Sequence, residues 1–267
     1  MALSCLKLQI VSILMERFKM LSRLRNRKSR KGFTLIELIV VLFILVGLAA
    51  LIIPTVSGMV GRTTASTSAS SIGNVANAIQ RYEAQFMQYP DNFDSLKTSL
   101  AAGTELNTLD AAFIAATEEV TMSPTIRVPL TAAGITSVGI HTAGDGSYVL
   151  ALPTPLTNAA VLRGPTAATQ IAMGLEKSPG VAGKYIVLGV GSITDMKGRT
   201  IIEPPAAFPS DGSINPNLTY RRFMAIFQIS DGTNPLTRAK LVGVLAPDAS
   251  NVSTELGNYF TLAQPNN

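Results

Sequence analysis

Side chains that usually carry catalytic chemistry are sparse in this chain of 267 residues. His141 is the only histidine and Cys5 the only cysteine, which excludes sites built on two histidines or on a cysteine cluster. Asp145 lies near His141, but no Gly-x-Ser-x-Gly elbow occurs anywhere in the chain. The stretch Gly189-Val-Gly-Ser192 lacks the Gly-Lys-Ser/Thr that completes a phosphate loop. We therefore expect His141 to be a loop or strand-end residue and the chain not to be an enzyme.

Metal binding is the second chemistry to consider, because isolated acids occur in the turn-like stretches of the second half. They are Asp195, Asp211, Asp231 and Asp248. None belongs to a DxDxDG array, and Ca²⁺ needs about six to eight oxygen ligands. We expect these residues to be turn formers and the chain to have no metal or other cofactor. Calcium bound in the C-terminal part is the weaker alternative.

Glu37 is the most unusual charge, because it is the only charged residue in the apolar stretch Phe33–Ile53. As a helix, a stretch of this length extends about 31 Å, close to the ~30 Å hydrocarbon core of a bilayer. We predict a transmembrane helix over 33–53 that stays with the mature protein, since it is too long for the apolar region of a cleaved signal peptide. A carboxylate at the bilayer centre costs about 2.5 kcal/mol or more. Either Glu37 lies shallow enough to be hydrated, or a partner compensates its charge on assembly.

The positive charge of the chain is confined to its N-terminus. The net charge is +5, yet residues 1–32 hold nine of the 22 basic residues and one of the 17 acids, leaving 13 basic and 16 acidic residues in 33–267. Nucleic-acid binding by the bulk of the chain therefore has no electrostatic support. The positive-inside bias predicts a single-pass inner-membrane protein with a cytoplasmic N-terminus and an extracytoplasmic, periplasmic C-terminal part.

The basic run leads into the sequence Arg30-Lys-Gly-Phe-Thr-Leu-Ile-Glu-Leu-Ile-Val-Val-Leu42. This stretch resembles the processing motif of type IV pilins and type II secretion pseudopilins. The resemblance implies that residues 1–32 are a leader, which a prepilin peptidase removes by cutting between Gly32 and Phe33. It also implies that Phe33 is then N-methylated and that Glu37 is the glutamate used in assembly.

Each role that the resemblance implies for Gly32, Phe33 and Glu37 has a physical reason. Gly32 has no Cβ, so an extended backbone can approach a peptidase closely. Cleavage releases a cationic amine at Phe33, and Glu37 of a neighbouring subunit can approach that amine when subunits stack with an axial offset. A pair in a low-dielectric setting is strong, and an unpaired carboxylate there is costly, so the pair would act mainly to set the register.

The start of the chain has three candidates, because the leader is longer than usual for the family. Translation beginning at Met15 or Met20 rather than Met1 gives a shorter and more basic leader. In either case Cys5 is absent from the protein.

Residues 54–89 are predicted to form the amphipathic half of the same long helix. Pro54 is expected to kink or interrupt the helix, and Gly58 and Gly61 to make residues 54–61 flexible. An apolar stripe at helical spacing follows: Ile72, Val75, Ile79, Tyr82 and Phe86. The helix should end at Tyr89-Pro90, a junction that resembles the one in G-type pseudopilins.

Residues 90–267 are predicted to form a globular α+β head, with an antiparallel β-sheet packed on the N-terminal helix. We expect a short helix within 105–120 and a surface excursion over 153–183. The expected strands are Tyr148–Leu152, Lys184–Val190, Thr200–Glu203, Arg222–Ile229, Lys240–Ala246 and Tyr259–Leu262. Arg222–Ile229 and Lys240–Ala246 should form a hairpin with a long turn.

The sequence thus favours a structural filament subunit, a type IV pilin or a type II secretion pseudopilin. Its expected partners are a prepilin peptidase, an inner-membrane assembly platform with its cytoplasmic ATPase, and other copies or other pilins. Two alternatives stay open. One is a minor pilin whose head binds a surface, DNA or a secreted substrate, and the other is a membrane-anchored extracytoplasmic binding protein that does not polymerise.

Overall fold

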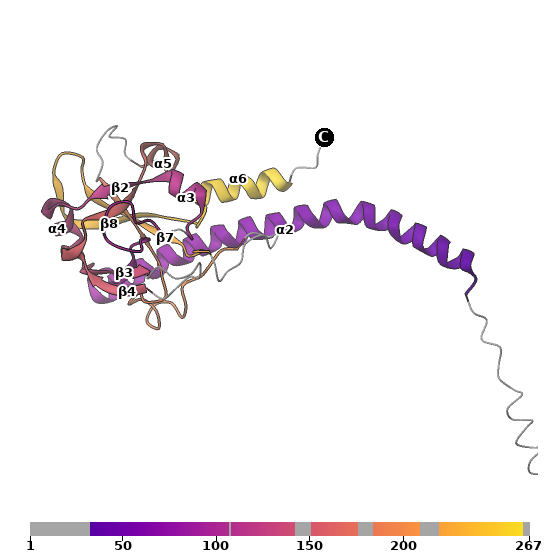
Figure 1. Cartoon of the computed structure of the whole chain (residues 1–267), viewed down its shortest axis with the longest axis horizontal. Coiled ribbons are helices and arrows are strands. Elements are labelled where there is room, and N and C mark those ends of the chain that lie inside the picture. The colour runs from indigo at the N-terminus through magenta and orange to yellow at the C-terminus, as the bar shows by residue number, and fades with distance from the viewer. Residues whose placement is uncertain (1–32, 107, 142–150, 176–183, 209–218, 264–267) are drawn as a thin grey trace, which may run out of the picture. The chain divides into compact units, whose positions relative to one another are not determined.

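The computed structural model in Figure 1 describes residues 33–106, 108–141, 151–175, 184–208 and 219–263. Contacts between residues divide the chain into two compact units, Met1–Pro54 and Thr55–Asn267. The first described element is helix α2, Leu35–Phe86, which contributes residues to both units. The remaining helices and strands all belong to the second unit.

Helix α2 is continuous through residues 54–61, so the predicted interruption at Pro54 is wrong, whereas the flexibility expected over 54–61 stays a prediction. A proline removes one backbone hydrogen bond, but propagation of a helix is favourable once helical turns exist on both sides. Long runs of helical residues flank Pro54 in both directions. The kink expected at Pro54 stays a prediction.

The second half of α2 buries the stripe that the spacing predicts. Ile72, Val75, Ile79 and Tyr82 are buried, whereas Phe86, the last residue of the helix, is 43% exposed. The helix ends when Met87 adopts a left-handed conformation with φ of +60°. The amide of Met87 still donates to the carbonyl of Glu83 at 2.8 Å, which satisfies one of the last carbonyls.

Among the residues that the structure describes, no helix combines the length and apolarity that crossing a membrane requires. The membrane insertion predicted for residues 33–53 stays a prediction.

The head is built on one eight-stranded sheet. Its strands are β1 Phe93–Asp94, β2 Thr117–Thr121, β3 Ser137–His141, β4 Ala151–Pro155, β5 Val161–Pro165, β6 Tyr185–Gly189, β7 Met224–Ser230 and β8 Pro235–Leu245. The order is β2-β5-β6-β1-β3-β4, and β7 pairs with β6 on one side and with β8 on the other. All pairs are antiparallel except β1 with β3. The predicted α+β class with a largely antiparallel sheet is therefore confirmed.

Four short helices and one 3₁₀ turn complete the part of the head that the structure describes. They are α3 Ala111–Ala116, α4 Pro124–Ala132, the turn Leu156–Asn158, α5 Ala167–Ala172 and α6 Val252–Ala263. The helices α3, α4 and α5 each begin after a side chain that accepts a backbone N–H: Asp110, Ser123 and Thr166. Such caps stabilise helices that are too short to form on their own.

The main core lies where the second half of α2 packs on the sheet. Its buried residues come from α2, from α4 and from most strands of the sheet, with Val75, Ile79, Ile186 and Phe227 fully buried. A smaller cluster lies elsewhere in the head, around Phe113, Tyr185, Tyr220 and Met224. The sheet therefore uses apolar residues on both of its faces, and α2 covers one of them.

Several predicted elements of the head are corrected by the structure. Tyr259–Leu262 is helical, as part of α6, and Thr200–Glu203 forms only an isolated bridge at Ile201. The excursion expected over 153–183 is wrong where the structure describes it, because it contains part of β4, the fully buried strand β5, and α5. The helix expected within 105–120 is α3, after which the chain continues as β2.

The strands predicted at 184–190, 222–229 and 240–246 are found as β6, β7 and β8, with shifted ends. The hairpin β7–β8 is confirmed, but its turn is short, since Ser230 pairs directly with Pro235. Of the strand predicted at 148–152, residues 151 and 152 are found in β4, and the other three lie outside the described residues.

Candidate functional site

The start of α2 is closed by a reciprocal pair of side chains, Thr34 and Glu37. The Glu37 Oε2 accepts the Thr34 backbone N–H at 2.8 Å and the Thr34 hydroxyl at 2.9 Å, while the Glu37 N–H donates to the Thr34 Oγ1 at 3.3 Å. This is a capping box, in which the first residue before the helix and the third residue within it satisfy each other's free N–H groups. It fixes the carboxylate at the N-terminal end of the helix, where the helix dipole favours a negative charge.

The Thr34–Glu37 pair leaves part of the carboxylate for another partner. No residue that the structure describes donates a hydrogen bond to Oε1 of Glu37. Phe33, immediately before the cap, is 86% exposed. The exposed side chains of both residues are therefore available to a group from outside the chain.

Around this cap, α2 exposes apolar side chains on every face. The large apolar residues that are at least 40% exposed here include Leu35, Ile36, Leu38, Ile39, Val40, Val41, Leu42, Phe43, Ile44, Leu45, Val46 and Leu48. An exposed apolar surface of this extent is rare in monomeric soluble proteins and marks a site of contact with a protein or a membrane. Among the residues of unit 1 that the structure describes, no element other than α2 is present to cover this surface.

The head is fastened to the end of α2 by three arginines. Arg81 donates to the Thr200 carbonyl at 3.1 Å, and Arg199 donates to the Tyr82 hydroxyl at 2.9 Å while lying over the Phe86 ring. Arg238 of β8 pairs with Glu83 at 3.2 Å and donates to the Met87 carbonyl. These contacts, with the apolar stripe beneath them, fix the head rigidly on residues 72–87.

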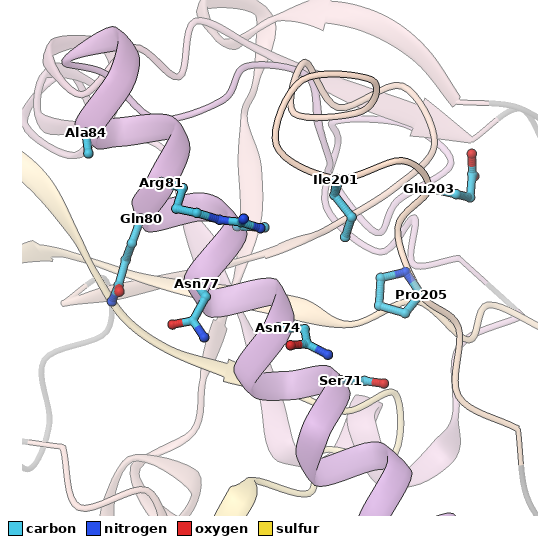
Figure 2. A pocket seen from close by; sticks show the side chains of 10 residues that line it. Ser71, Asn74, Asn77, Gln80, Arg81, Ala84, Ile201, Glu203 and Pro205 are labelled. Carbon is cyan, nitrogen blue, oxygen red and sulfur yellow. The ribbon is translucent and has the colours of Figure 1, made fainter.

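A groove of 780 Å³ runs along α2 in the head. Figure 2 shows Asn74 and Arg81 extending from α2 toward the loop that carries Ile201 and Pro205, whereas Gln80 points away from that loop. The amides offer donors and acceptors, but they are exposed and no aromatic side chain lines the groove. This surface suits a polar contact with another chain better than a small apolar ligand.

His141 ends strand β3, as predicted, but it lies in a buried polar cluster. Its Nε2 is 3.5 Å from Oδ2 of Asp94, and the same oxygen accepts the Tyr220 hydroxyl at 2.9 Å. All three side chains are at most 1% exposed, so no substrate atom can reach them. We assign this cluster a structural role, in which it ties β1 and β3 to the segment before β7.

Of the four acids considered for calcium, Asp231 and Asp248 form turns as expected, whereas Asp195 hydrogen-bonds to a side chain far away in the sequence. Asp231 accepts the N–H groups of Thr233 and Asn234, Asp248 accepts that of Ser250, and Asp195 accepts the Asn92 amide. Asp211 lies outside the described residues. In the described part of the chain, no three His, Cys, Asp or Glu side chains gather as a metal site would require. The calcium alternative stays untested.

Of the residues predicted to act in processing and assembly, Gly32 lies outside the described residues. Phe33 and Glu37 lie together at the start of α2, whereas Pro54 is helical and distant from them along the helix. The capping role of Thr34 was missed, although the pattern Thr-x-x-Glu before an apolar run is a known sequence signal for it. The pair Lys97–Glu119 and the cluster around Asp94 were also not predicted, because no local sequence pattern indicates either of them.

Comparison with known proteins agrees with this site. Residues 27–52 match the family model of the prokaryotic N-terminal methylation motif, the signature of type IV pilin and pseudopilin precursors. No curated protein and no solved structure matches the chain significantly. The motif implies a membrane-anchored, pilin-like subunit that is processed by a prepilin peptidase and assembles with other pilins. Its family is structural rather than enzymatic.

Proposed function

We propose that this chain, whose N-terminus carries the pilin-type methylation motif, is a structural subunit of a type IV pilus or a type II secretion pseudopilus. In this proposal residues 1–32 are removed, Phe33 is methylated, and α2 anchors the subunit in the inner membrane with the head outside the cytoplasm. An assembly platform and its cytoplasmic ATPase then move the subunit into a fibre.

One observation carries the proposal: the matched motif includes an apolar helix segment whose large side chains are exposed along the described part of the first unit. Burying such side chains is worth about 25 cal/mol for each Å² removed from water. Packing α2 helices side by side in a fibre supplies that burial outside the membrane. A head fixed rigidly to residues 72–87 would then be displayed on the outside of the fibre.

Glu37 has a defined part in this assembly. Thr34 holds one carboxylate oxygen, which leaves Oε1 for the amine that cleavage creates on Phe33 of a second copy. Such a pair is charge-assisted and lies in an apolar setting, so it favours one axial register over others.

The decisive experiment replaces Glu37 in cells that assemble the fibre. We expect Glu37→Ala, and to a lesser degree Glu37→Gln, to leave membrane insertion and cleavage intact but to reduce sheared filaments about tenfold or more. Thr34→Val is the matched control, because it removes one capping hydroxyl while keeping the carboxylate. Normal filament yield from Glu37→Ala would contradict the role of Glu37.

The alternatives differ in what sheared material contains. If the chain is the principal component of the fibre, it is a major subunit. A trace amount in a fibre made of another pilin indicates a minor subunit, for which the polar groove along α2 is the candidate binding surface. Its complete absence from fibres favours a membrane-anchored binding protein.

A further inference from the structure

Helix α6, Val252–Ala263, buries its one acid and exposes a row of apolar side chains. Its only charged residue, Glu255, is 6% exposed and lines a cavity against α2, together with Ala65 and Ser68. Its apolar residues Val252, Leu256 and Phe260 are 39%, 44% and 63% exposed. A spacing of four residues places these three side chains along one face of the helix.

The position of this apolar face is fixed by contacts with α2. Tyr259 lies under the Arg62 guanidinium, 5.3 Å from it, and Asn258 and Thr261 line the same cavity as Gly61 and Thr64. Figure 1 shows α6 running beside α2. Nearby on α2, Val56, Met59 and Val60 are exposed as well. The face of α6 therefore continues an apolar surface that begins on α2.

We propose that the exposed face of α6, formed by Val252, Leu256 and Phe260, docks on the exposed apolar half of α2 in a second copy of the chain. This inference rests on the proposed function, because it needs copies that pack through α2. It adds a contact in which the C-terminal end of each head helps to cover the helix of a neighbour.

The charges of the two surfaces favour this partner over a lipid bilayer. Amphipathic helices that lie on membranes are rich in Lys and Arg on their polar face, whereas α6 contains neither. The α2 surface from Leu38 to Val60 carries no charge either, so the two faces match without desolvating any ion.

The glycines of the two helices support a close approach. Gly257 lies within α6 and Gly47 within α2, where glycine weakens a helix, and an added Cβ at either position would meet no atom of the chain within 4 Å. The chain's own packing thus gives no reason for glycine at these positions. Helices that pack closely against each other favour small residues at the contact.

Disulfide cross-linking in the assembled fibre tests the inference. Because Cys5 is the only cysteine and precedes the predicted cut, the processed chain offers a cysteine-free background. Two differently tagged full-length chains are co-expressed, one with Phe260→Cys and the other with a cysteine replacing Leu38, Leu42, Leu45 or Leu48. We expect at least one pair to give a mixed disulfide about tenfold above that of Thr254→Cys, an exposed position on the opposite side of α6.

A second pair of chains separates this inference from the proposed function. Leu38→Cys with Leu45→Cys reports packing between α2 helices. If this pair cross-links while Phe260→Cys gives no more product than Thr254→Cys, the α6 contact is refuted, whereas the proposed function as a fibre subunit is supported. If neither pair cross-links and shearing releases no filaments, both proposals fail. Disulfides between two Phe260→Cys chains alone, or protection of Phe260→Cys by vesicles without any second copy, would also overturn the α6 contact.

A double substitution that should not change the stability of the head provides an independent test. Leu256 and Phe260 are exposed in the single chain, so Leu256→Ser with Phe260→Ser should leave the thermal melting of the head unchanged. The same double change should lower the yield of sheared filaments about tenfold, since it removes apolar area from the contact. An unchanged yield would contradict the proposal.

Discussion

The two halves of α2 have similar helical structure but opposite relations to the rest of the chain. From residue 35 to residue 48 nearly every large apolar side chain is exposed, whereas Ile72, Val75, Ile79 and Tyr82 are buried against the sheet. The first half has a continuous apolar surface and the second a single stripe, and this difference decides what each half needs. The second half packs on the sheet of its own head, whereas the first half leaves the apolar surface for which we propose other copies as the partner.

The comparison leads first to two matched substitutions, one in the buried half of α2 and one in its exposed half. We expect Ile79→Ala to lower the free energy of unfolding of the head by about 2–5 kcal/mol, because it leaves a cavity in a closely packed core. Leu42→Ala, in the exposed half, should change that free energy by less than about 0.5 kcal/mol. Guanidinium unfolding of the full chain in detergent, followed by circular dichroism, measures both. A loss of head stability in Leu42→Ala would break the distinction between the two halves.

A buried ion pair in the head gives the next largest effect. The side chain of Lys97 is fully buried and pairs with Glu119, which is 29% exposed. We expect Glu119→Gln to cost about 3 kcal/mol, because it leaves a buried cation without its counter-ion. Lys97→Met with Glu119→Gln should recover most of that loss. If the single and double variants are equally unstable, the pair does not act through charge.

The pH dependence of the same pair has a definite sign. The Lys97 ammonium and the Gly103 N–H hold the pKa of Glu119 below its ordinary value of 4.5. Because the pKa of Glu119 is lowered on folding, its charge stabilises the folded head at pH values above the pKa that Glu119 has in the unfolded chain. This stabilisation is lost as the pH falls through the pKa of Glu119 in the folded chain. The Glu119→Gln variant should lose this part of the acid sensitivity.

Glu255 makes the smallest contribution to the pH dependence of stability, and its sign is opposite to that of Glu119. Burial and the charge of Asp248 raise the pKa of Glu255, against the Ser250 hydroxyl, which donates to it at 2.5 Å. A raised pKa means that stability falls as pH rises from the unfolded value of about 4.5 through the folded one. We expect Glu255→Gln to be more stable than the wild type at neutral pH, because the variant keeps no buried charge there. Equal pH profiles of unfolding for the two proteins would show that Glu255 is not responsible.

How much of this fold the sequence predicts depends on how local each signal is. The stripe from Ile72 to Tyr82, the strands β6 and β7 and the motif around Glu37 each repeat or combine signals within a few residues, and all are found as expected or matched. Tyr259 and Phe260 favour a strand by type, but contacts with Arg62 and the Asn251 cap make that segment helical. Strand β5 contains Arg163 and Gly164, and it becomes a central strand because Arg163 finds Glu105 and Thr117 in the folded head.

The candidate site shows the same division. Gly32, Phe33 and Glu37 all lie within one short matched motif, as does the Thr34 cap, and the roles of the three in processing and assembly stay predictions. The continuity of α2 through Pro54 was not predictable from the proline alone, since long helical segments on both sides outweigh one missing hydrogen bond. The apolar face of α6 was unpredictable because only the tertiary structure shows that Glu255 points inward and Phe260 outward.

The central claim is that the exposed half of α2 belongs to a processed subunit. Intact-mass and N-terminal analysis of the chain, taken from sheared filaments and from the membrane fraction of the native cells, tests it directly. We predict a chain that begins at Phe33 and is heavier by one methyl group on its N-terminal amine. A chain in both fractions that still carries residues before Phe33 would contradict the account.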